Sequence, residues 1–314
     1  MLSAISHQVQ GIWPKKTTFT VDQIPDMSGK VVIVTGANRG IGKEISKVLL
    51  EKNAKVYIAT RNIDKAKDAI EDLYRLTGRK AVFLKLDLAD LKVITAAVQE
   101  FLSMETRLDI LFNNAGVMAT PMTETTVEGY DLQFGVNALG HFLFTKRLLP
   151  LMLRTASSSP PGTVRIVSLS SSLHAFRNGI NFDTLKDGRA RRKENSMWHY
   201  TQSKFAIIVI ALEFARRYGE HGIVSTSVHP GVIETDLHSH ILGVARKIGG
   251  KLLFANVEQG ALAPLYAGAS EEGAKLNGKY VIPWTTVGTA SKDTQESAIG
   301  TKLWDWLEEQ IQDI

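Results

Sequence analysis

Residues 35–42 read TGANRGIG and join two different sequence patterns. The run VVIVT at 31–35 is apolar and β-branched, which is typical of a buried strand, and the residues from 40 onward open a helix. Glycines at such a junction let the chain turn tightly and bring backbone N–H groups and the helix N-terminus against a pyrophosphate. The glycine pattern alone is a weak signal, but its position between a strand and a helix predicts a nucleotide site.

The same strand-then-helix order repeats along the chain and predicts an α/β fold. Strands are expected at 31–35, 55–60, 81–88, 108–116, 164–171 and 224–231, with an edge strand at 279–282. Helices are expected at about 40–52, 62–77, 90–104, 127–154, 200–219 and 258–270. Apolar strands of this kind must be covered on both faces, so we expect a single Rossmann-type, doubly wound sheet of about seven mostly parallel strands with helices on both faces.

No linker rich in Pro, Gly or Ser interrupts this alternation, so we expect one domain. An N-terminal arm at 1–27 lacks the pattern of a signal peptide, and the domain then spans 28–314. The longest apolar run, 206–212, is far shorter than the roughly 20 residues that cross a bilayer, and a cytoplasmic protein is the expectation. Two segments break the alternation: 173–198, which contains a basic run at 189–193, and 237–256, which is apolar at helical spacing.

Composition excludes several kinds of chemistry. The chain of 314 residues has no cysteine, which rules out disulfides, thiolate catalysis and zinc–cysteine clusters. Its histidines, His141 and His174 among them, show no metal-ligand spacing, so no metal is predicted and we expect them to be structural or close to substrate. The net charge of +5 is spread over a long chain and does not indicate nucleic-acid binding.

Further short motifs fall at or near the ends of the predicted strands, where an open α/β sheet has its ligand crevice. They are DL at 87–88, NNAG at 113–116, Ser171, YTQSK at 200–204 and PG at 230–231, with Asn137 inside the long helix. With the glycine loop, these motifs resemble the short-chain dehydrogenase/reductase family over about residues 28–285. The stretches GANRGIGKE, NNAGVM and FGVNALGHF are similar to the branch that contains retinol dehydrogenases and WW-domain oxidoreductases.

Tyr200 and Lys204 are four residues apart and share one face of a predicted helix. An adjacent ammonium and an oxidised nicotinamide favour the phenolate and lower a phenol pKa that is ordinarily near 10. The resemblance implies that Tyr200 exchanges a proton with the substrate oxygen, that Ser171 hydrogen-bonds this oxygen, that Lys204 also holds the nicotinamide ribose and that Asn137 supports a water chain. Strand alternation points the neighbouring Ser170 the other way, toward a structural hydrogen bond.

The second predicted strand ends at 60–62 with TRN, without the acidic residue that accepts bonds from the ribose of NAD. Arg61, together with Arg39 of the glycine loop, can instead converge on a 2′-phosphate, which favours NADP(H). The resemblance implies that the cofactor is bound by the glycine loop, the strand ends and the helical pair: Gly36, Asn38, Arg39, Gly40, Ile41, Gly42, Arg61, Asp87, Leu88, Asn113, Asn114, Ala115, Gly116, Tyr200, Lys204, Pro230, Gly231, Val232, Ile233 and Thr235.

The expected function is therefore an NADP-dependent oxidoreductase that acts on CH–OH donors and interconverts a carbonyl and an alcohol on a small apolar molecule. The alternative is a catalytically silent NADP(H)-binding regulatory protein. The segment 237–256 is expected to form a substrate lid, and fixed packing on the domain is its alternative. Its basic and apolar faces also suit weak contact with a membrane surface. A monomer and a homodimer formed through the helices at 127–154 and 200–219 both fit the sequence. In a monomer, the apolar C-terminal segment at 303–307 could cover part of the same face.

Overall fold

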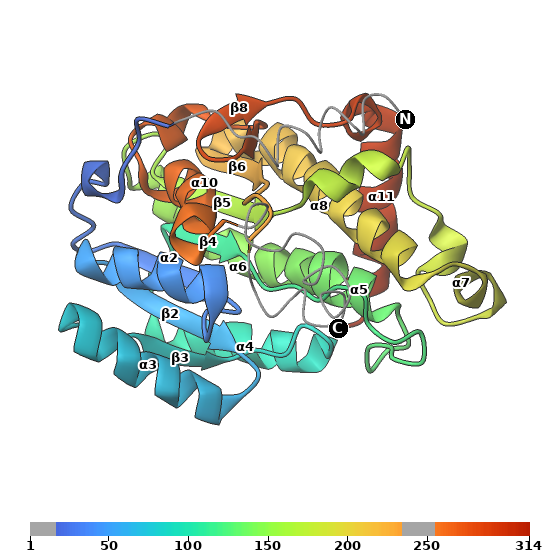
Figure 1. Cartoon of the computed structure of the whole chain (residues 1–314), viewed down its shortest axis with the longest axis horizontal. Coiled ribbons are helices and arrows are strands. Elements are labelled where there is room, and N and C mark those ends of the chain that lie inside the picture. Colours follow the sequence, from blue (N-terminus) through green and yellow to red (C-terminus); the bar gives the residue numbers. More distant parts are fainter. Residues whose placement is uncertain (1–16, 234–254) are drawn as a thin grey trace.

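A computed structural model describes residues 17–233 and 255–314 of the chain. Its centre is one sheet of eight strands in the order β3-β2-β1-β4-β5-β6-β7-β8 (Figure 1). The strands from β1 to β7 pair in parallel, and β8 is antiparallel to β7. The strands are β1 (Val31–Thr35), β2 (Lys55–Thr60), β3 (Val82–Lys85), β4 (Ile110–Asn113), β5 (Val164–Leu169), β6 (Ile223–Val228), β7 (Tyr280–Ile282) and β8 (Thr286–Gly288).

Helices connect the parallel strands, as crossover connections require. The α-helices are α2 (Gly40–Glu51), α3 (Ile63–Thr77), α4 (Leu91–Met104), α5 (Leu132–Phe134), α6 (His141–Ser157), α7 (Arg189–Lys193), α8 (Ser196–Tyr218), α10 (Val257–Ala269) and α11 (Ser297–Ile311). A π-helical turn, η2 (Gly135–Gly140), joins α5 to α6. Short 3₁₀ turns are η1 (Val21–Gln23), η3 (Ser172–Phe176), η4 (Phe182–Thr184), η5 (Gly219–His221), η7 (Glu272–Lys275) and η8 (Lys292–Gln295).

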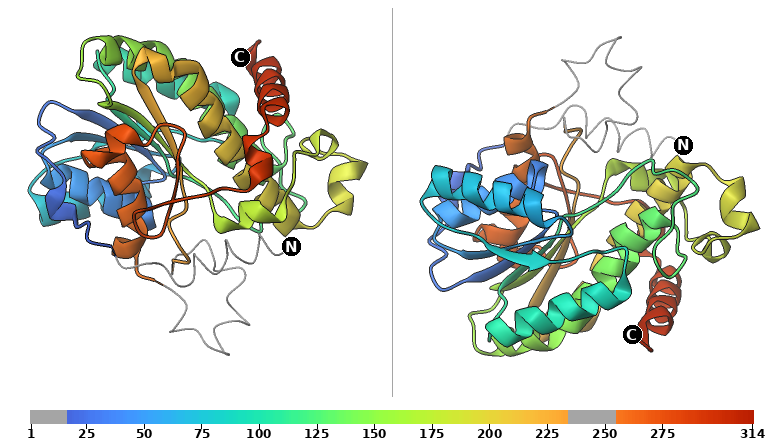
Figure 2. Two further views of the ribbon diagram at one scale, coloured as in Figure 1. Left: turned by 90° about the horizontal axis from the view of Figure 1, so that it is seen from above. Right: turned by 90° about the horizontal axis from the view of Figure 1, so that it is seen from below.

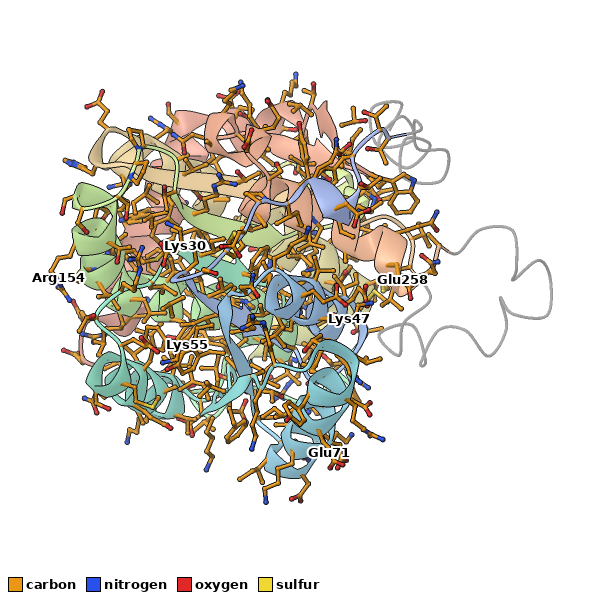
Figure 3. All side chains as sticks on the ribbon, turned by 90° about the vertical axis from the view of Figure 1, so that its left-hand side faces the viewer. Lys30, Lys47, Lys55, Glu71, Arg154 and Glu258 are labelled. Atoms are coloured by element: carbon orange, nitrogen blue, oxygen red, sulfur yellow. The ribbon has the colours of Figure 1, made fainter. Side chains whose placement is uncertain are left out.

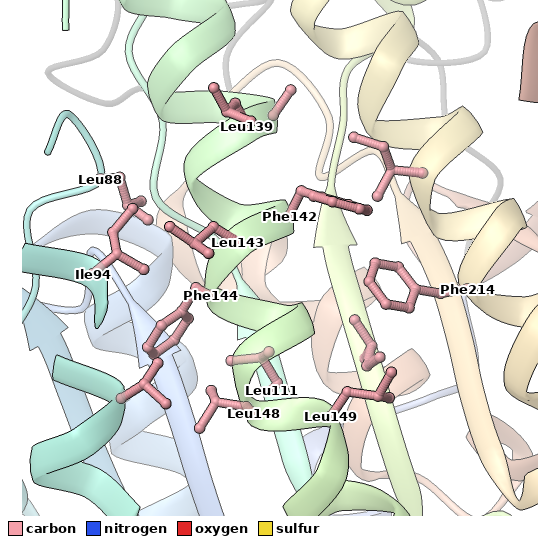
Figure 4. Packing of buried hydrophobic residues seen from close by; sticks show 14 of the residues in the cluster. Leu88, Ile94, Leu111, Leu139, Phe142, Leu143, Phe144, Leu148, Leu149 and Phe214 are labelled. Carbon is pink, nitrogen blue, oxygen red and sulfur yellow. The ribbon is translucent and has the colours of Figure 1, made fainter. Parts of the chain in front are cut away.

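The sheet is buried on both faces because alternate residues of each strand enter different apolar layers. Val32 and Val34 of β1 pack in the layer formed with α2, α3 and α10, whereas Val31 and Ile33 pack in the layer formed with α4, α6, α8 and α11. Figure 2 shows α2 between α3 and α10, and α11 on the outer side of α8. Figure 4 shows how α6 fills the second layer, with Phe142 turned toward Phe214 of α8.

Charges of both signs lie around the periphery rather than on one face. Lys55, Glu71 and Arg154 are all exposed, with Glu71 and Arg154 at different edges of the view and Lys55 between them (Figure 3). Among the described residues, no helix has the length and apolar character needed to cross a bilayer. A cytoplasmic location stays a prediction.

The predicted alternation of strands and helices is confirmed, but several boundaries were wrong. The strands expected to reach 88, 116, 171 and 231 end at Lys85, Asn113, Leu169 and Val228, because the residues beyond them leave the ladder to form the crevice. The helix expected from 127 begins at Leu132, since the side chain of Asp131 caps it by accepting from the backbone N–H groups of Gln133 and Phe134. The helix expected from 200 already begins at Ser196.

Strand β8 was not predicted and adds an eighth, antiparallel strand to the expected seven. Helix α11 contains the C-terminal segment 303–307 and packs on the outer side of α6 and α8, which was one of the arrangements that the sequence left open. In the predicted N-terminal arm, Ile24 and Met27 are buried in the apolar layer of α2 and α3. The division into an arm at 1–27 and one domain at 28–314 stays a prediction, and the segment proposed as a lid, 237–256, lies outside the described residues except for its last two.

Candidate functional site

The strand order reverses direction between β1 and β4, and this is where an open α/β sheet forms a crevice at its carboxyl edge. The predicted site residues of the described chain follow the carboxyl ends of the strands from β1 to β6, or stand on the helices η2 and α8 beside them. The structure therefore brings residues from six strand ends and two helices to one edge of the sheet.

In the loop after β1 and the first turn of α2, either the backbone conformation or a close contact requires glycine at three positions. Gly36 and Gly40 adopt φ values of +68° and +55°, which L-residues with side chains rarely adopt. A Cβ on Gly42 would lie 2.5 Å from Nδ2 of Asn114, so the loop and the segment after β4 are in close contact. In the same loop, Oδ1 of Asn38 accepts a hydrogen bond of 3.1 Å from the Thr60 hydroxyl at the end of β2. The N-terminus of α2 is thus held at the crevice in a fixed position.

The Thr35 hydroxyl at the end of β1 is the centre of a buried hydrogen-bond network. It accepts from the backbone N–H groups of Asn114 and Ala115, each at 2.9 Å, and lies 2.9 Å from Nε2 of His141. Nδ1 of His141 lies 3.2 Å from the backbone oxygen of Asn137, which can only accept, so Nδ1 carries the hydrogen and Nε2 accepts from Thr35. Burial lowers the pKa of His141 to about 4, so its ring is neutral at pH 7. Thr35 was not predicted, and His141 was treated only as structural or close to substrate.

Asn137 stands on the π-helical turn and binds the backbone of Val117 on one side and the Ser203 side chain on the other. Its Oδ1 accepts from the Val117 N–H at 2.8 Å, and its Nδ2 donates to the Val117 oxygen at 3.0 Å and to the Ser203 hydroxyl at 2.9 Å. A Cβ on Gly116 would lie 3.2 Å from Oδ1 of Asn137 and 3.7 Å from Nζ of Lys204. Gly116 therefore leaves open the space between these two polar groups.

Tyr200 and Lys204 lie on α8 and are both buried, with 4% and 5% of their surfaces exposed. Nζ of Lys204 lies 5.6 Å from the Tyr200 ring centroid and donates to the backbone oxygen of Leu169 at 2.9 Å. Burial lowers the pKa of Lys204 to about 7. Burial also raises the pKa of Tyr200, and a hydrogen bond with the Ser171 side chain opposes this rise only in part. In the chain alone, burial therefore keeps the phenol protonated at neutral pH. The expected effect of the ammonium together with an oxidised nicotinamide stays a prediction.

The two neighbouring serines have different contacts, as strand alternation predicted. The Ser170 hydroxyl is buried and donates to the backbone oxygen of Lys204 at 2.7 Å, which confirms its structural role. Ser171 is half-buried at the start of η3 and interacts with Tyr200. Its backbone oxygen accepts from Nδ1 of His174 at 2.7 Å, while Nε2 of His174 accepts from the Ser291 N–H at 3.0 Å. His174, which sequence reasoning did not assign, therefore connects Ser171 to the C-terminal part of the chain.

The charged residues expected at the adenosine end are exposed at the same edge. Arg39 precedes α2 and Arg61 follows β2, and neither side chain is buried. Asp87 is half-buried and its Oδ1 accepts from the Ala89 N–H at 3.0 Å, while Leu88 packs in the core. Asn113 is buried and donates to the Thr145 hydroxyl at 3.0 Å, away from the crevice.

The segment after β6 lies between the ends of α10 and β7. Gly231 has a φ of +98°, and a Cβ there would lie 3.1 Å from the Trp284 ring. Val232 accepts through its backbone oxygen from the Ala255 N–H at 2.9 Å, after Pro230 and Gly231 have turned the chain. Ile41 and Ile233 both approach Gly260, where a Cβ would lie 3.2 Å and 2.8 Å from their side chains. Thr235 lies outside the described residues.

Comparison with known proteins gives consistent results. The family described as short chain dehydrogenase matches residues 30–182. A short-chain dehydrogenase/reductase of Armillaria gallica is 50% identical over 302 residues, 96% of each chain. Retinol dehydrogenase 12 of Mus musculus is 37% identical over 290 residues, 90% of this chain and 85% of the mouse protein. A crystal structure from Mycobacterium paratuberculosis is 27% identical with a TM-score of 0.72, covering 94% of this chain and 98% of the other.

Proposed function

The chain belongs to the short-chain dehydrogenase/reductase family and is an oxidoreductase, and from this we propose that it uses NADP(H) to interconvert a carbonyl and an alcohol on an apolar small molecule. The observation that carries the proposal is the convergence of Ser171, Tyr200 and Lys204 at the sheet edge, with a buried lysine whose pKa is about 7.

The chain's own groups perform the proton chemistry in this proposal. When bound, the nicotinamide supplies or accepts the hydride. In reduction the protonated phenol of Tyr200 donates to the substrate oxygen, and in oxidation it accepts the alcohol proton. The Ser171 hydroxyl interacts with the phenol and is positioned to hydrogen-bond the same oxygen. Asn137 fixes Val117 and Ser203 and so holds the wall beside Lys204 in place.

The residues present fit the cofactor. The glycine loop presents the N-terminus of α2 to an anion, and the missing Cβ at Gly116 lets the backbone after β4 approach Asn137 and Lys204 closely. Gly36, Gly42 and Asn114 would hold the pyrophosphate end, and Lys204 would bind the nicotinamide ribose. Exposed Arg39 and Arg61, with no acid at the end of β2, favour the 2′-phosphate of NADP(H) over the free hydroxyl of NAD(H).

An exposed aromatic residue that follows Ser171 along the chain supports an apolar substrate. Phe176 ends η3, which begins directly after Ser171, and is 44% exposed. The mouse relative is named for retinol, which is also apolar, although the proposal is limited to the substrate class.

The experiment that tests this function measures NADPH oxidation with a panel of aldehydes, ketones and quinones. Replacing Tyr200 with Phe removes the hydroxyl that transfers the proton and keeps the ring, so we expect unchanged NADPH binding and turnover lower by about a hundredfold or more. Near-normal turnover by Tyr200→Phe would refute the assignment of the acid. NADPH binding by the unmodified protein without turnover of any substrate, in either direction, would instead support the silent regulatory protein.

A further inference from the structure

The basic run at 189–193 interrupts the α/β alternation, and one of its members is buried away from the sheet. Arg191 of α7 has 1% of its surface exposed and is among the largest fully buried side chains of the described chain. Its Nε donates to Oδ2 of Asp131 at 2.9 Å, and the Asp131 side chain is also 1% exposed. The neighbouring Arg192 has a side chain that is 66% exposed. One arginine of the run is therefore part of the interior and the next is not.

The Arg191 guanidinium binds three separate parts of the chain. Besides Asp131, its Nη1 donates to the Met122 backbone oxygen at 2.7 Å and its Nη2 donates to the Glu124 backbone oxygen at 2.9 Å. A weaker contact of 3.3 Å joins Nη1 to Asp187. The planar fork of an arginine can satisfy a carboxylate and two carbonyls at once, which the single ammonium of a lysine cannot do in the same geometry.

Asp131 connects this interaction to the helix that carries Asn137. Its Oδ1 accepts from the N–H groups of Gln133 and Phe134, both at 3.0 Å, and thereby caps α5 directly before the π-helical turn. On the other side, Nε2 of His199 lies 3.1 Å from the Arg191 backbone oxygen, and Tyr200 is the next residue. The ion pair thus lies between the two helices that present the proposed catalytic residues.

The loop that Arg191 holds is the continuation of the crevice wall. Residues 117–124 follow Gly116 directly, and both backbone groups of Val117 bind the Asn137 side chain. Gln133 connects this loop to the start of α8. Its Oε1 accepts from the Ala119 N–H at 2.9 Å, and its Nε2 donates to the Ser196 backbone oxygen at 2.7 Å. Two buried side chains therefore fix this loop against the start of α8.

We propose that Arg191 is a positioning residue for substrate: it holds the loop 117–124 and the start of α8 in the arrangement that shapes the substrate part of the crevice. The proposal rests on the proposed oxidoreductase function. A buried ion pair is a poor source of net stability compared with apolar packing, because desolvation offsets the attraction. The Arg191 guanidinium instead fixes the position of the loop, because no strand or helix between Gly116 and Asp131 does so.

The first test compares Arg191→Lys with Arg192→Lys. Arg191→Lys keeps the charge opposite Asp131 but loses the fork, so we expect the KM for the carbonyl substrate to rise by about tenfold or more. The KM for NADPH should change by less than about twofold, because the cofactor contacts are elsewhere. Arg192→Lys, on the same helix but exposed, is the matched control and should leave both KM values unchanged. A fall in kcat alone, with the substrate KM unchanged, would indicate lost folded protein and would overturn the proposal.

A second variant separates positioning from stability. Arg191→Met together with Asp131→Asn removes both charges and keeps an acceptor for the α5 cap, so it should regain thermal stability relative to Arg191→Met alone. We expect the substrate KM to stay high in this double variant. Recovery of the substrate KM along with stability would show that the Arg191–Asp131 ion pair acts only on folding and would overturn the proposal.

Hydrogen exchange distinguishes failure of this proposal from failure of the proposed function. Amides of 117–124 should exchange faster in Arg191→Lys than in Arg192→Lys, with NADPH present in both samples. Equal exchange in the two variants overturns the positioning role. Absence of turnover in the unmodified protein would refute the oxidoreductase proposal without altering this exchange comparison.

Discussion

Lys204 donates to the backbone oxygen of Leu169, and its side chain is almost fully buried. Burial therefore lowers the pKa of Lys204 to about 7. The same burial raises the pKa of Tyr200, which keeps the phenol protonated. The pKa values of Tyr200 and Lys204 thus shift in opposite directions for the same reason, which is burial. A nearby anionic cofactor would restore the positive charge of the lysine. Spacing alone gave the pair but could not give the extent of burial.

Cofactor preference can be tested at the residue scale through Arg39 and Arg61. Replacing both with Gln should raise the KM for NADPH much more than the KM for NADH, because each charge-assisted bond to a phosphate contributes about 1.5–3 kcal/mol. The measurement is steady-state kinetics with each cofactor at saturating substrate. Lys67→Gln, on the exposed face of α3, is a suitable control for general loss of positive charge. Equal use of NADPH and NADH by the unmodified enzyme would contradict the NADP(H) preference.

At the scale of elements, the strands that are buried on both faces were predictable from their apolar runs. β1 and β2 have the predicted bounds, whereas β4 is shorter than expected because Asn114 and Ala115 leave the sheet to bind Thr35. β8 has only three residues and no apolar run, so nothing in its sequence distinguishes it from a loop. The Arg191–Asp131 pair joins residues 60 positions apart, and neither periodicity nor a motif indicates such a contact.

His141 couples three elements, since it begins α6 and binds the end of β1 and the π-helical turn. Its pKa is lowered to about 4 in the fold, mainly by burial, against an ordinary value of 6.5. The unfolded chain therefore binds a proton more readily than the folded chain between these values. The free energy of unfolding is unaffected by this group above pH 6.5 and falls as the pH is lowered from 6.5 to 4.

We therefore expect His141 to lower the free energy of unfolding by about 2 kcal/mol between pH 7 and pH 5. Urea denaturation at both pH values measures this difference. His141→Gln should reduce the pH dependence by that amount, whatever its effect on stability at pH 7. His221→Gln, which removes an exposed histidine of η5, is the control. An unchanged pH dependence in His141→Gln would show that the Thr35–His141 interaction does not require a neutral ring.

At the scale of the whole molecule, α11 covers part of the surface through which two copies of the chain could associate. Trp304 packs edge-on against Phe142 of α6 and Phe214 of α8, with ring centroids 5.0 Å apart in each case. Leu303, Leu307 and Ile311 of the same helix are also buried in this layer. These are the helices through which the sequence suggested a homodimer could form. Because α11 packs on these helices, we predict a monomer.

The mass of the protein in solution tests this conclusion. We expect a monomer at all concentrations in sedimentation or light-scattering measurements. Trp304→Asp combined with Leu307→Asp should detach α11, because burying two carboxylates costs several kcal/mol, and the uncovered apolar face should then produce concentration-dependent dimers. Thr301→Asp adds a charge on the exposed side of the same helix and should stay monomeric. A dimer formed by the unmodified protein would mean that another surface mediates association, and a double variant that stays monomeric would mean that α11 covers the layer without preventing self-association.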